Sequence, residues 1–411
     1  MQRIYNFFIS LMIFGIKVGA SFNYKLKRGL AGRRQSCDIL KSVFSKDDSV
    51  IWMHAASLGE YEQGLPVLER LKNKYPQHRI LITFFSPSGY EVVVKKNTIA
   101  DAVCYLPFDK PVWINEFLSN FKPVIFFTVK YEYWYNLLQK LKRDQVKIYV
   151  ISSLFYERQI FFKPYGKWCV KQLRKNVDWF FHQTNTSYAL AKTIKLDQSS
   201  ISGDTRYDRV RQIKERDSHV DFIAEFKEEK LLLVFGSSWE TEEEIARIVA
   251  AKLPELKIII APHDLKRVEY LQHLFPNSVL YSETTVEQQP DVQVMIIDSV
   301  GLLSKIYAYA DLAFVGGGFH SAGLHNILEA ATFGIPVLFG NRYQKNPEAD
   351  DLIRNKGGVS FLDENYAADF ILKIMNDQKL LEEMGRNAGE FISNQPNSTE
   401  LIMKKIVSDL G

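Results

Sequence analysis

The sequence predicts an α/β protein made of two doubly wound, Rossmann-like domains that face a cleft. Its 411 residues exceed the length of one typical domain. From about residue 48, short apolar runs alternate with segments whose apolar residues recur at helical spacing. The alternation stops in a polar, charged stretch that ends near Lys230, and then it starts again. Runs of βα units imply parallel sheets, and the restart implies a second domain.

In the first half, apolar runs predict strands at residues 49–54, 79–85, 101–106, 123–128, 146–152 and 177–183. Helices are expected at 61–74, from 90, at 113–121, 134–141 and 163–175. In the second half, strands are expected at 231–235, 257–261, 294–297, 312–315 and 337–339, and helices from 241, 265, 302 and 325. We therefore place an N-terminal domain at 35–210 and a C-terminal domain at 225–378. Helices at 379–411 could pack back on the first domain.

Residues 1–34 form a separate segment that carries seven basic residues and no acidic one. Its apolar run, 4–16, is shorter than the ~20 residues that span a bilayer, and Lys17 interrupts it. The basic residues mostly follow the run, which is unlike a signal peptide. We expect a short helix that anchors the chain on anionic lipid. A spanning helix and an ordinary buried helix remain alternatives.

The composition excludes several classes of protein. A net charge of +4 is too small to indicate a nucleic-acid partner. Cys37, Cys104 and Cys169 are too far apart in sequence to suggest a zinc site or a disulfide framework, which favours a reducing compartment. No P-loop and no dinucleotide fingerprint occurs, and the first domain has no Asp-x-Asp motif. These absences argue against an NTPase, a dehydrogenase and a single-domain, metal-dependent sugar transferase.

Polar residues follow two strands of the first domain, where doubly wound sheets bind ligands. His54 ends the first strand, and Ser57 and Glu60 follow it. A carboxylate here could act as a general base, although an acidic residue in a first helical turn also complements the helix dipole.

A second cluster, Glu132, Trp134 and Asn136, follows the strand at 123–128. Aromatic residues mixed with polar ones suit sugar or lipid binding, and packing in the core is the alternative.

In the second domain, Ser237 and Ser238 follow the first strand, where they could hold a phosphate or cap a helix. Pro262, His263 and Arg267 follow the next strand and could grip a nucleotide.

The strand at 312–315 runs into Gly316, Gly317 and Gly318, then Gly323, and then a helix expected to start at His325. Glycines followed by a helix N-terminus form an anion site, in which Glu329 could accept from a ribose hydroxyl. A tight glycine turn is the alternative.

Taken together, these motifs resemble the bacterial 3-deoxy-D-manno-octulosonic acid (Kdo) transferases of lipid A assembly. The resemblance spans nearly the whole chain. The segments that carry it are His54–Glu60, Thr83–Gly89, Leu106–Asp109, Glu132–Asn136, Pro262–Arg267, Gly316–Glu329 and Phe339–Asn341. The chain departs from the family pattern at Lys130 (usually Glu), Tyr135 (usually Pro), Gly318 (Ser), Leu324 (Gly) and Arg206 (commonly Lys).

The resemblance implies a GT-B fold and an inverting transfer of Kdo from CMP-Kdo to a lipid A precursor, without a metal or cofactor. It implies that Glu60 is the general base and that His54, Ser57, Glu132, Trp134 and Asn136 bind the acceptor. The donor would be bound by Arg206, Ser237, Ser238, Pro262, His263, Arg267, Gly316, Gly317, Gly318, Gly323, His325, Asn326 and Glu329. It places the protein on the cytoplasmic face of the inner membrane, in contact with anionic lipids. A GT-B transferase or epimerase that uses a UDP-sugar, and an inactive membrane-bound nucleotide-binding module, are the alternatives.

Overall fold

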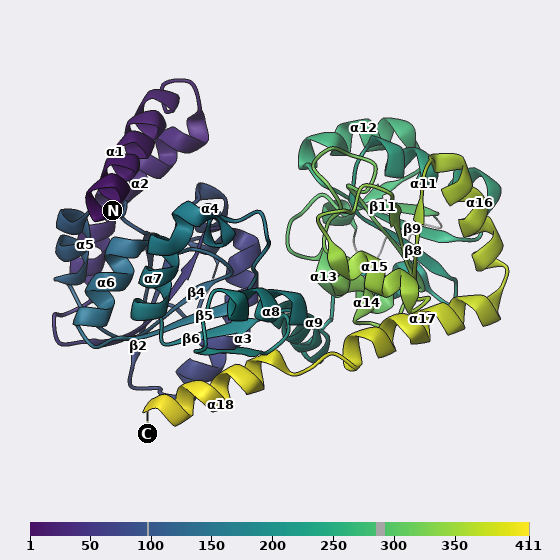
Figure 1. Ribbon diagram of the computed structural model, residues 1–411. Coiled ribbons are helices and arrows are strands. Elements are labelled where there is room, and N and C mark those ends of the chain that lie inside the picture. Colours follow the sequence, from purple (N-terminus) through teal and green to yellow (C-terminus); the bar gives the residue numbers. More distant parts are fainter. Residues whose placement is uncertain (97, 285–291, 411) are drawn as a thin grey trace. The chain divides into compact units, whose positions relative to one another are not determined.

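The structure is a computed structural model that describes residues 1–96, 98–284 and 292–410, and the chain folds into two compact units (Figure 1). Unit 1 comprises Met1–Arg209 and Pro396–Gly411, and unit 2 comprises Val210–Gln395. The C-terminal helices divide between the units. Helix α17 (Gln378–Ser393) belongs to unit 2. Helix α18 (Ser398–Leu410) lies in unit 1, where Ile402 and Ile406 are fully buried.

Unit 1 contains a seven-stranded parallel sheet in the order β3-β2-β1-β4-β5-β6-β7. The strands are β1 (Ser49–Ala55), β2 (Arg79–Phe84), β3 (Ala102–Tyr105), β4 (Lys122–Val129), β5 (Lys147–Ser153), β6 (Trp179–His182) and β7 (Ser199–Ile201). The predicted parallel, doubly wound sheet is confirmed, and β7 is a strand that the sequence did not indicate. Strand β1 is buried on both faces from Val50 to Ala55, as expected for a sheet covered by helices on both sides.

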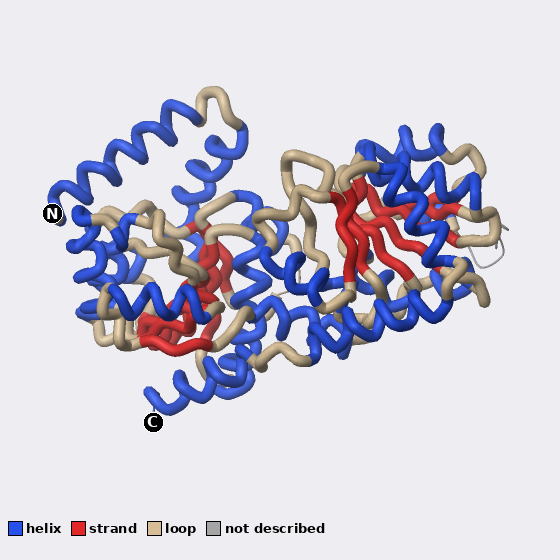
Figure 2. Tube along the Cα trace, turned by 45° about the vertical axis from the view of Figure 1, so that its right-hand side comes forward, coloured by secondary structure: helices blue, strands red, loops and turns tan. Residues whose placement is uncertain are grey.

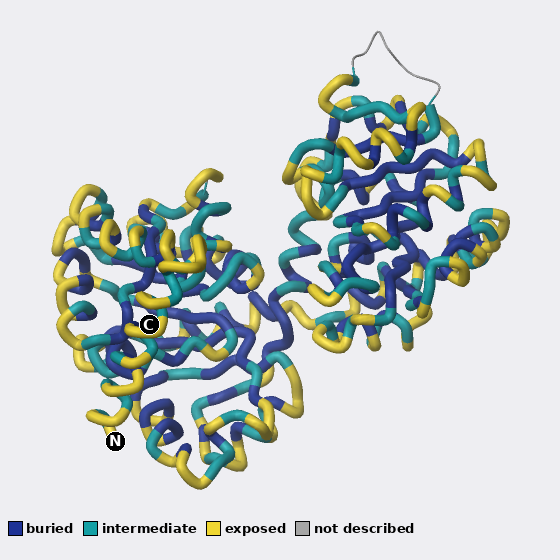
Figure 3. Tube along the Cα trace, turned by 90° about the horizontal axis from the view of Figure 1, so that it is seen from above, coloured by how far each residue is buried: buried dark blue, intermediate teal, exposed yellow. Residues whose placement is uncertain are grey.

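Two apolar cores lie on the two faces of this sheet. Figure 2 shows helices around the strands, and Figure 3 shows that the strands are largely buried. The helices are α3 (Leu58–Lys74), α4 (Pro87–Val93), α5 (Pro111–Leu118), α6 (Tyr135–Arg143), α7 (Lys167–Asn176), α8 (Asn185–Thr193) and α9 (Thr205–Glu215), with 3₁₀ turns at Ile160–Phe162 and Pro164–Gly166. Helix α9 continues from unit 1 into unit 2.

Unit 2 repeats the plan with a second seven-stranded parallel sheet, in the order β10-β11-β9-β8-β12-β13-β14. Its strands are β8 (Leu232–Ser238), β9 (Lys257–Pro262), β10 (Val279–Leu280), β11 (Val294–Ile296), β12 (Leu312–Val315), β13 (Val337–Gly340) and β14 (Gly358–Phe361). Its helices are α10 (Ile223–Lys227), α11 (Glu240–Lys252), α12 (Val268–Leu274), α13 (Leu303–Ile306), α14 (Leu328–Ala331), α15 (Pro347–Arg354), α16 (Glu364–Met375) and α17, with 3₁₀ turns at Leu265–Arg267, Tyr281–Glu283 and Tyr307–Tyr309.

The N-terminal segment is a pair of helices, α1 (Gln2–Gly19) and α2 (Tyr24–Val43), bent by 120° where they join. Among the described helices, none is by itself long and apolar enough to cross a bilayer, although these two satisfy the same length and composition limits as a bent pair. Helix α1 buries Ile9 and Ile13 against unit 1. Its other face exposes Phe7, Phe8 and Phe14, each to more than half of its surface.

Each sheet reverses its strand order at one point, and both reversals position candidate residues. In unit 1 the first strand, β1, lies between β2 and β4, and in unit 2 β8 lies between β9 and β12. A crevice opens beyond the carboxyl ends of the strands at such switch points, and ligands of doubly wound folds bind there. The loops that follow β1, β4, β8, β9 and β12 are therefore the places to look for chemistry.

Candidate functional site

In unit 1, Glu60 lies in the first turn of α3, just beyond the carboxyl end of β1. It is only 8% exposed, and the Ser57 hydroxyl donates a hydrogen bond of 3.0 Å to its Oε2. Burial raises the pKa of Glu60, and the negative charge of Glu132 raises it further, while Lys130 and the bond from Ser57 oppose the shift. A carboxylate with a raised pKa is a stronger base than an exposed glutamate, which is the property a general base needs.

His54 and Glu132 come together beside Glu60. The His54 ring is fully buried, and its Nδ1 lies 3.1 Å from the carbonyl oxygen of Thr83. Nδ1 also lies 3.0 Å from the Thr83 hydroxyl oxygen, and Nε2 faces Glu132 Oε2 at 3.8 Å. The Trp134 indole N–H donates to the same oxygen over 3.1 Å. Four of the residues assigned to the acceptor side, His54, Ser57, Glu132 and Trp134, thus form one group with Glu60.

Asn136 is directed elsewhere. Its side-chain Nδ2 donates to the backbone oxygen of Asp109 and to Asn6 Oδ1, and its Oδ1 accepts from Gln2. Its polar atoms therefore tie helix α1 to the body of unit 1 instead of joining the Glu60 group.

Arg206, which was assigned to the donor, lies in unit 1. Its Nε donates to the buried carboxylate of Asp204 over 2.8 Å.

In unit 2, four aromatic rings form a continuous ladder above the ends of β8, β9 and β12. The Trp239 ring stacks on His320 with centroids 3.9 Å apart and on His263 at 4.4 Å. His263 in turn contacts His325 at 4.7 Å. Burial, with a smaller contribution from the neighbouring His263, lowers the pKa of His325 to about 4. Among the described residues, Trp239 Nε1 and His325 Nε2 are buried polar atoms without a hydrogen-bond partner.

The glycine run is held against this ladder by a buried carboxylate, Glu242. Its Oε1 accepts from the backbone N–H of Gly317 and its Oε2 from that of Trp239, each over 3.0 Å. Burial raises the pKa of Glu242 to about 7, even though both N–H bonds oppose the shift. Gly317 has φ +85°, a conformation that favours glycine, and Gly318 packs directly on the backbone of Gly340.

The structure corrects the expectation that a helix begins at His325. Helix α14 begins only at Leu328 and has a single turn of four residues. Asn326 Oδ1 accepts from the Leu328 N–H, and the Asn326 amide donates to Glu329 over 3.0 Å. The His325 N–H instead donates back to Gly316, so the chain closes a loop before it turns into the helix. One turn carries little macrodipole, and the helix-terminus argument for an anion site therefore does not hold here.

The remaining donor-side residues are placed around the same loops. Ser237, like Gly317, has positive φ, and Ser238 donates to Glu243 over 3.3 Å. Pro262 ends β9. A Cβ atom at Gly323 would have space around it, but the backbone there has φ +92°, which favours glycine. Arg267 donates to Glu243 over 2.9 Å and also pairs with Glu240, so its guanidinium is already engaged by carboxylates.

Sequence reasoning missed Trp239, Glu242 and His320 as site residues. Trp239 and Glu242 stand in the stretch Ser237–Glu242, which also fits a capped helix start, and no spacing marks His320 as their neighbour. Their association depends on loops from separate strands, and only the folded chain reveals it. Within the described residues, no group of three His, Cys, Asp or Glu side chains is placed to hold a metal ion.

Comparisons with known proteins identify the class of protein. Residues 28–209 match the family model described as 3-deoxy-D-manno-octulosonic-acid transferase (kdotransferase). The chain is 26% identical over 331 residues to the 3-deoxy-D-manno-octulosonic acid transferase of Aquifex aeolicus, covering 78% of this chain and 85% of that protein. It is 28% identical over 357 residues to the enzyme of the same name from Haemophilus influenzae, covering 82% of each.

Among solved structures, the UDP-GlcNAc 2-epimerase of Neisseria meningitidis bound to UDP-GlcNAc is similar, with a TM-score of 0.59 and 14% identity over 88% of this chain and 100% of that chain. This likeness shows the fold, a GT-B-like pair of parallel-sheet α/β domains. The sequence relatives extend across both units, and the family match contains the whole Glu60 group. Residues 28–209 therefore match the Kdo transferase family, most of the chain is similar to proteins named Kdo transferases, and the chain is a glycosyltransferase.

Proposed function

We propose that this chain transfers Kdo from CMP-Kdo to a hydroxyl group of a lipid A precursor, by an inverting reaction in which Glu60 is the general base. The observation that carries the proposal is the buried Glu60, which lies at the switch point of unit 1 inside the segment that matches the family. Glu60 would take the proton from the acceptor hydroxyl as that oxygen attacks the anomeric carbon. The bond from that carbon to the CMP phosphate breaks, and CMP leaves with its electron pair.

Unit 2 would bind the donor. Two atoms of the ring ladder, Trp239 Nε1 and His325 Nε2, have no hydrogen-bond partner, and the Gly316–Gly318 backbone lies beside the ladder. Because His325 and His263 are held neutral by burial, an anionic donor would raise both of their pKa values and draw protons onto the rings. The glycosyl carboxylate and the phosphate of CMP-Kdo supply such charges.

Helix α1 would hold the enzyme on the cytoplasmic face of the inner membrane, where a lipid acceptor lies. Its exposed face carries Phe7, Phe8 and Phe14, and α2 adds basic residues beside it. Apolar side chains flanked by cations favour the interface of an anionic bilayer. Removal of residues 1–20 should release the protein from anionic vesicles in a flotation assay, and retention would assign binding to another surface.

The direct test is mass spectrometry of a lipid A precursor incubated with the full-length protein and CMP-Kdo. The proposal expects products heavier by one or more Kdo residues and a matching release of CMP. Parallel melting curves with CMP and UDP should show stabilisation by CMP. Stabilisation by UDP alone, with no Kdo product, would favour a UDP-sugar enzyme of the same fold.

A further inference from the structure

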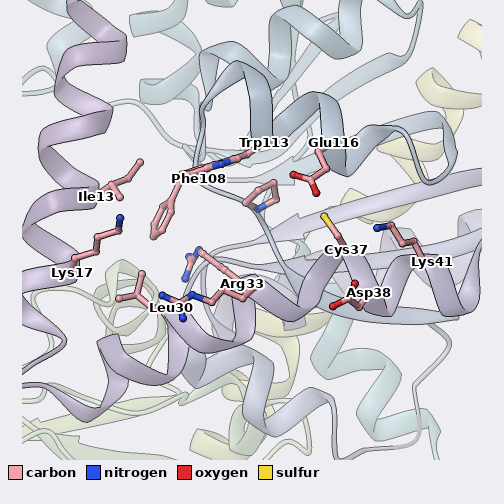
Figure 4. Close-up of a pocket in the computed structure, with 12 residues that line it drawn as sticks. Ile13, Lys17, Leu30, Arg33, Cys37, Asp38, Lys41, Phe108, Trp113 and Glu116 are labelled. Carbon is pink, nitrogen blue, oxygen red and sulfur yellow. The ribbon is translucent and has the colours of Figure 1, made fainter.

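A pocket of about 630 Å³ lies within unit 1, between the N-terminal helices and the segment that leads into α5 (Figure 4). Figure 4 shows Ile13 and Lys17 projecting from α1 toward Phe108, with Leu30 and Arg33 of α2 forming the opposite wall. Its volume falls in the range of ligand sites, roughly 300–1,000 Å³. No residue of the Glu60 group lines it.

One end of the pocket is apolar, and this end leads toward the Glu60 group. Ile13 and Phe108 belong to one buried cluster, against which Leu30, Trp113 and Trp134 also pack. Trp134 is the residue whose indole N–H donates to Glu132. The apolar wall of the pocket is thus continuous, through one side chain, with the carboxylates of the candidate site.

Arg33 builds the floor of the pocket and is not free to bind a ligand. Its guanidinium donates to the backbone oxygens of Gly29, Phe85 and Leu106. It also lies between two aromatic rings, 4.6 Å from the centre of Phe85 and 4.5 Å from that of Phe108. An arginine fixed in this way holds α2 against the segments that follow β2 and β3.

The rim carries more positive than negative charge. Lys17, Arg34 and Lys41 contribute cations, and Asp38 and Glu116 contribute carboxylates. Lys17 and Arg34 are exposed, and Lys17 shares the apolar end with Ile13. An anionic group would therefore be favoured at the rim beside Lys17 and Arg34, while the apolar wall suits a hydrocarbon chain.

The rim also adjoins the exposed face of α1. On that helix, Phe14 and Val18 are exposed on either side of Lys17, to 65% and 49%. A ligand that reached the pocket along this face would come from an apolar phase, as an amphiphile in a bilayer does.

We propose that this pocket binds an acyl chain of the lipid acceptor, with Lys17 and Arg34 facing the acceptor's phosphate. This inference rests on the proposed function and extends it, because it gives the acceptor a second anchoring point outside the Glu60 group. It predicts that the enzyme distinguishes acylated from deacylated acceptors through KM, since binding energy from a remote chain adds to recognition of the sugar.

The test compares full-length wild type with Leu30→Trp, which fills the pocket, and with Leu362→Trp, a matched change at an exposed site in unit 2. Each protein is assayed with an acylated lipid A precursor and with its fully deacylated, water-soluble counterpart. Leu30→Trp should raise KM for the acylated acceptor about tenfold or more, because each excluded methylene forfeits roughly fourfold in affinity. Its KM for the deacylated acceptor and its CMP affinity should match those of wild type.

A direct binding readout comes from Cys37, which lines the pocket and is the one cysteine of the three that is not buried. The acylated acceptor should slow alkylation of Cys37 by iodoacetamide, and the deacylated one should leave the rate unchanged. An unchanged KM for the acylated acceptor in Leu30→Trp, or equal alkylation rates with both acceptors, would overturn the pocket assignment while leaving Kdo transfer intact. If wild type transferred Kdo to neither acceptor, the proposed function would fall, and this inference with it.

Discussion

At its switch point the sheet of unit 1 ends in ionisable side chains, whereas the sheet of unit 2 ends in glycines and stacked rings. In unit 1, Glu60 and Glu132 lie close enough for each charge to disfavour the other, and Lys130 offsets part of that repulsion. In unit 2, the buried carboxylate of Glu242 accepts a backbone N–H at each of its oxygens. The same α/β architecture therefore presents a carboxylate with a raised pKa in one unit and a ladder of stacked rings beside glycines in the other.

The difference indicates how the two tasks of a transferase are divided. A general base needs a raised pKa, which Glu60 has, and we propose that role for it. Recognition of a nucleotide needs rigid loops and ring faces, and we propose that role for the ladder from His320 to His325. Substitutions in unit 1 should then change the rate and its pH dependence, and substitutions in unit 2 should change donor affinity and stability.

In unit 2, the largest effect is expected from Gly318→Ala. A methyl group there would lie 2.4 Å from the backbone nitrogen of Gly340, which cannot move aside without breaking the β13 edge. Overpacking of this kind costs about 1–3 kcal/mol or more. Hydrogen exchange should show faster exchange in unit 2 and unchanged exchange in unit 1, and CMP binding should be lost. Gly15→Ala, where an added methyl meets nothing within 4 Å, is the control; equal exchange in the two variants would contradict the packing argument.

Glu242→Gln should weaken CMP binding by about tenfold, because the amide has one acceptor where the carboxylate has two and leaves a buried N–H unpaired, at a cost of about 1–3 kcal/mol. Isothermal titration with CMP measures this. Glu244→Gln lies on the same helix and breaks only an exposed contact with Arg247, so its CMP affinity should equal that of wild type. Equal CMP affinity in the two variants would mean that Glu242 does not support the glycine loop.

Glu132→Gln should shift the acid limb of the kcat/KM profile to lower pH. The negative charge of Glu132 helps to raise the pKa of Glu60, so its removal lowers that pKa and leaves the base deprotonated at lower pH. Glu157→Gln, an exposed change in a neighbouring loop, should leave the limb in place. A shift to higher pH would mean that Glu132 affects Glu60 through something other than its charge.

The smallest effect concerns His325 in the ligand-free protein. Its pKa is lowered from 6.5 to about 4, so the unfolded chain binds a proton that the folded chain does not over that interval. Stability from this ring is complete above about pH 6.5 and is lost as the pH falls toward 4. His325→Phe keeps a ring against His263 and should flatten that part of the urea stability profile. If wild type and His325→Phe lost stability with the same slope against pH, the slope would come from other titrating groups.

Much of this arrangement could be predicted from the sequence, and the parts that could not share a physical cause. The alternation of apolar runs predicted both parallel sheets, and the position of Glu60 after β1 predicted the candidate base. The predicted start of the helix at His325 was wrong because the His325 N–H bonds back to Gly316 and the Leu328 N–H bonds to Asn326, and periodicity does not report such hydrogen bonds.

The second N-terminal helix was missed for a related reason. The start of this helix is rich in basic residues, and the sequence therefore indicated only a basic stretch there. In the structure, Arg33 and Leu40 pack against the rest of unit 1, and this packing stabilises the helix. The ring ladder joins loops from β8, β9 and β12, so no local window of sequence contains it. Contacts between loops far apart in the chain form only when the sheet brings them together.

The division of tasks is tested most directly by Glu60→Gln, measured beside Glu69→Gln on the same helix. The account predicts that Glu60→Gln lowers kcat for Kdo transfer by about 10²–10⁴-fold, the usual contribution of a general base. It also predicts that CMP binds this variant as tightly as wild type, and that Glu69→Gln keeps both properties. Turnover by Glu60→Gln close to that of wild type would contradict the assignment of the base, and a parallel loss of CMP affinity would contradict the separation of chemistry in unit 1 from donor binding in unit 2.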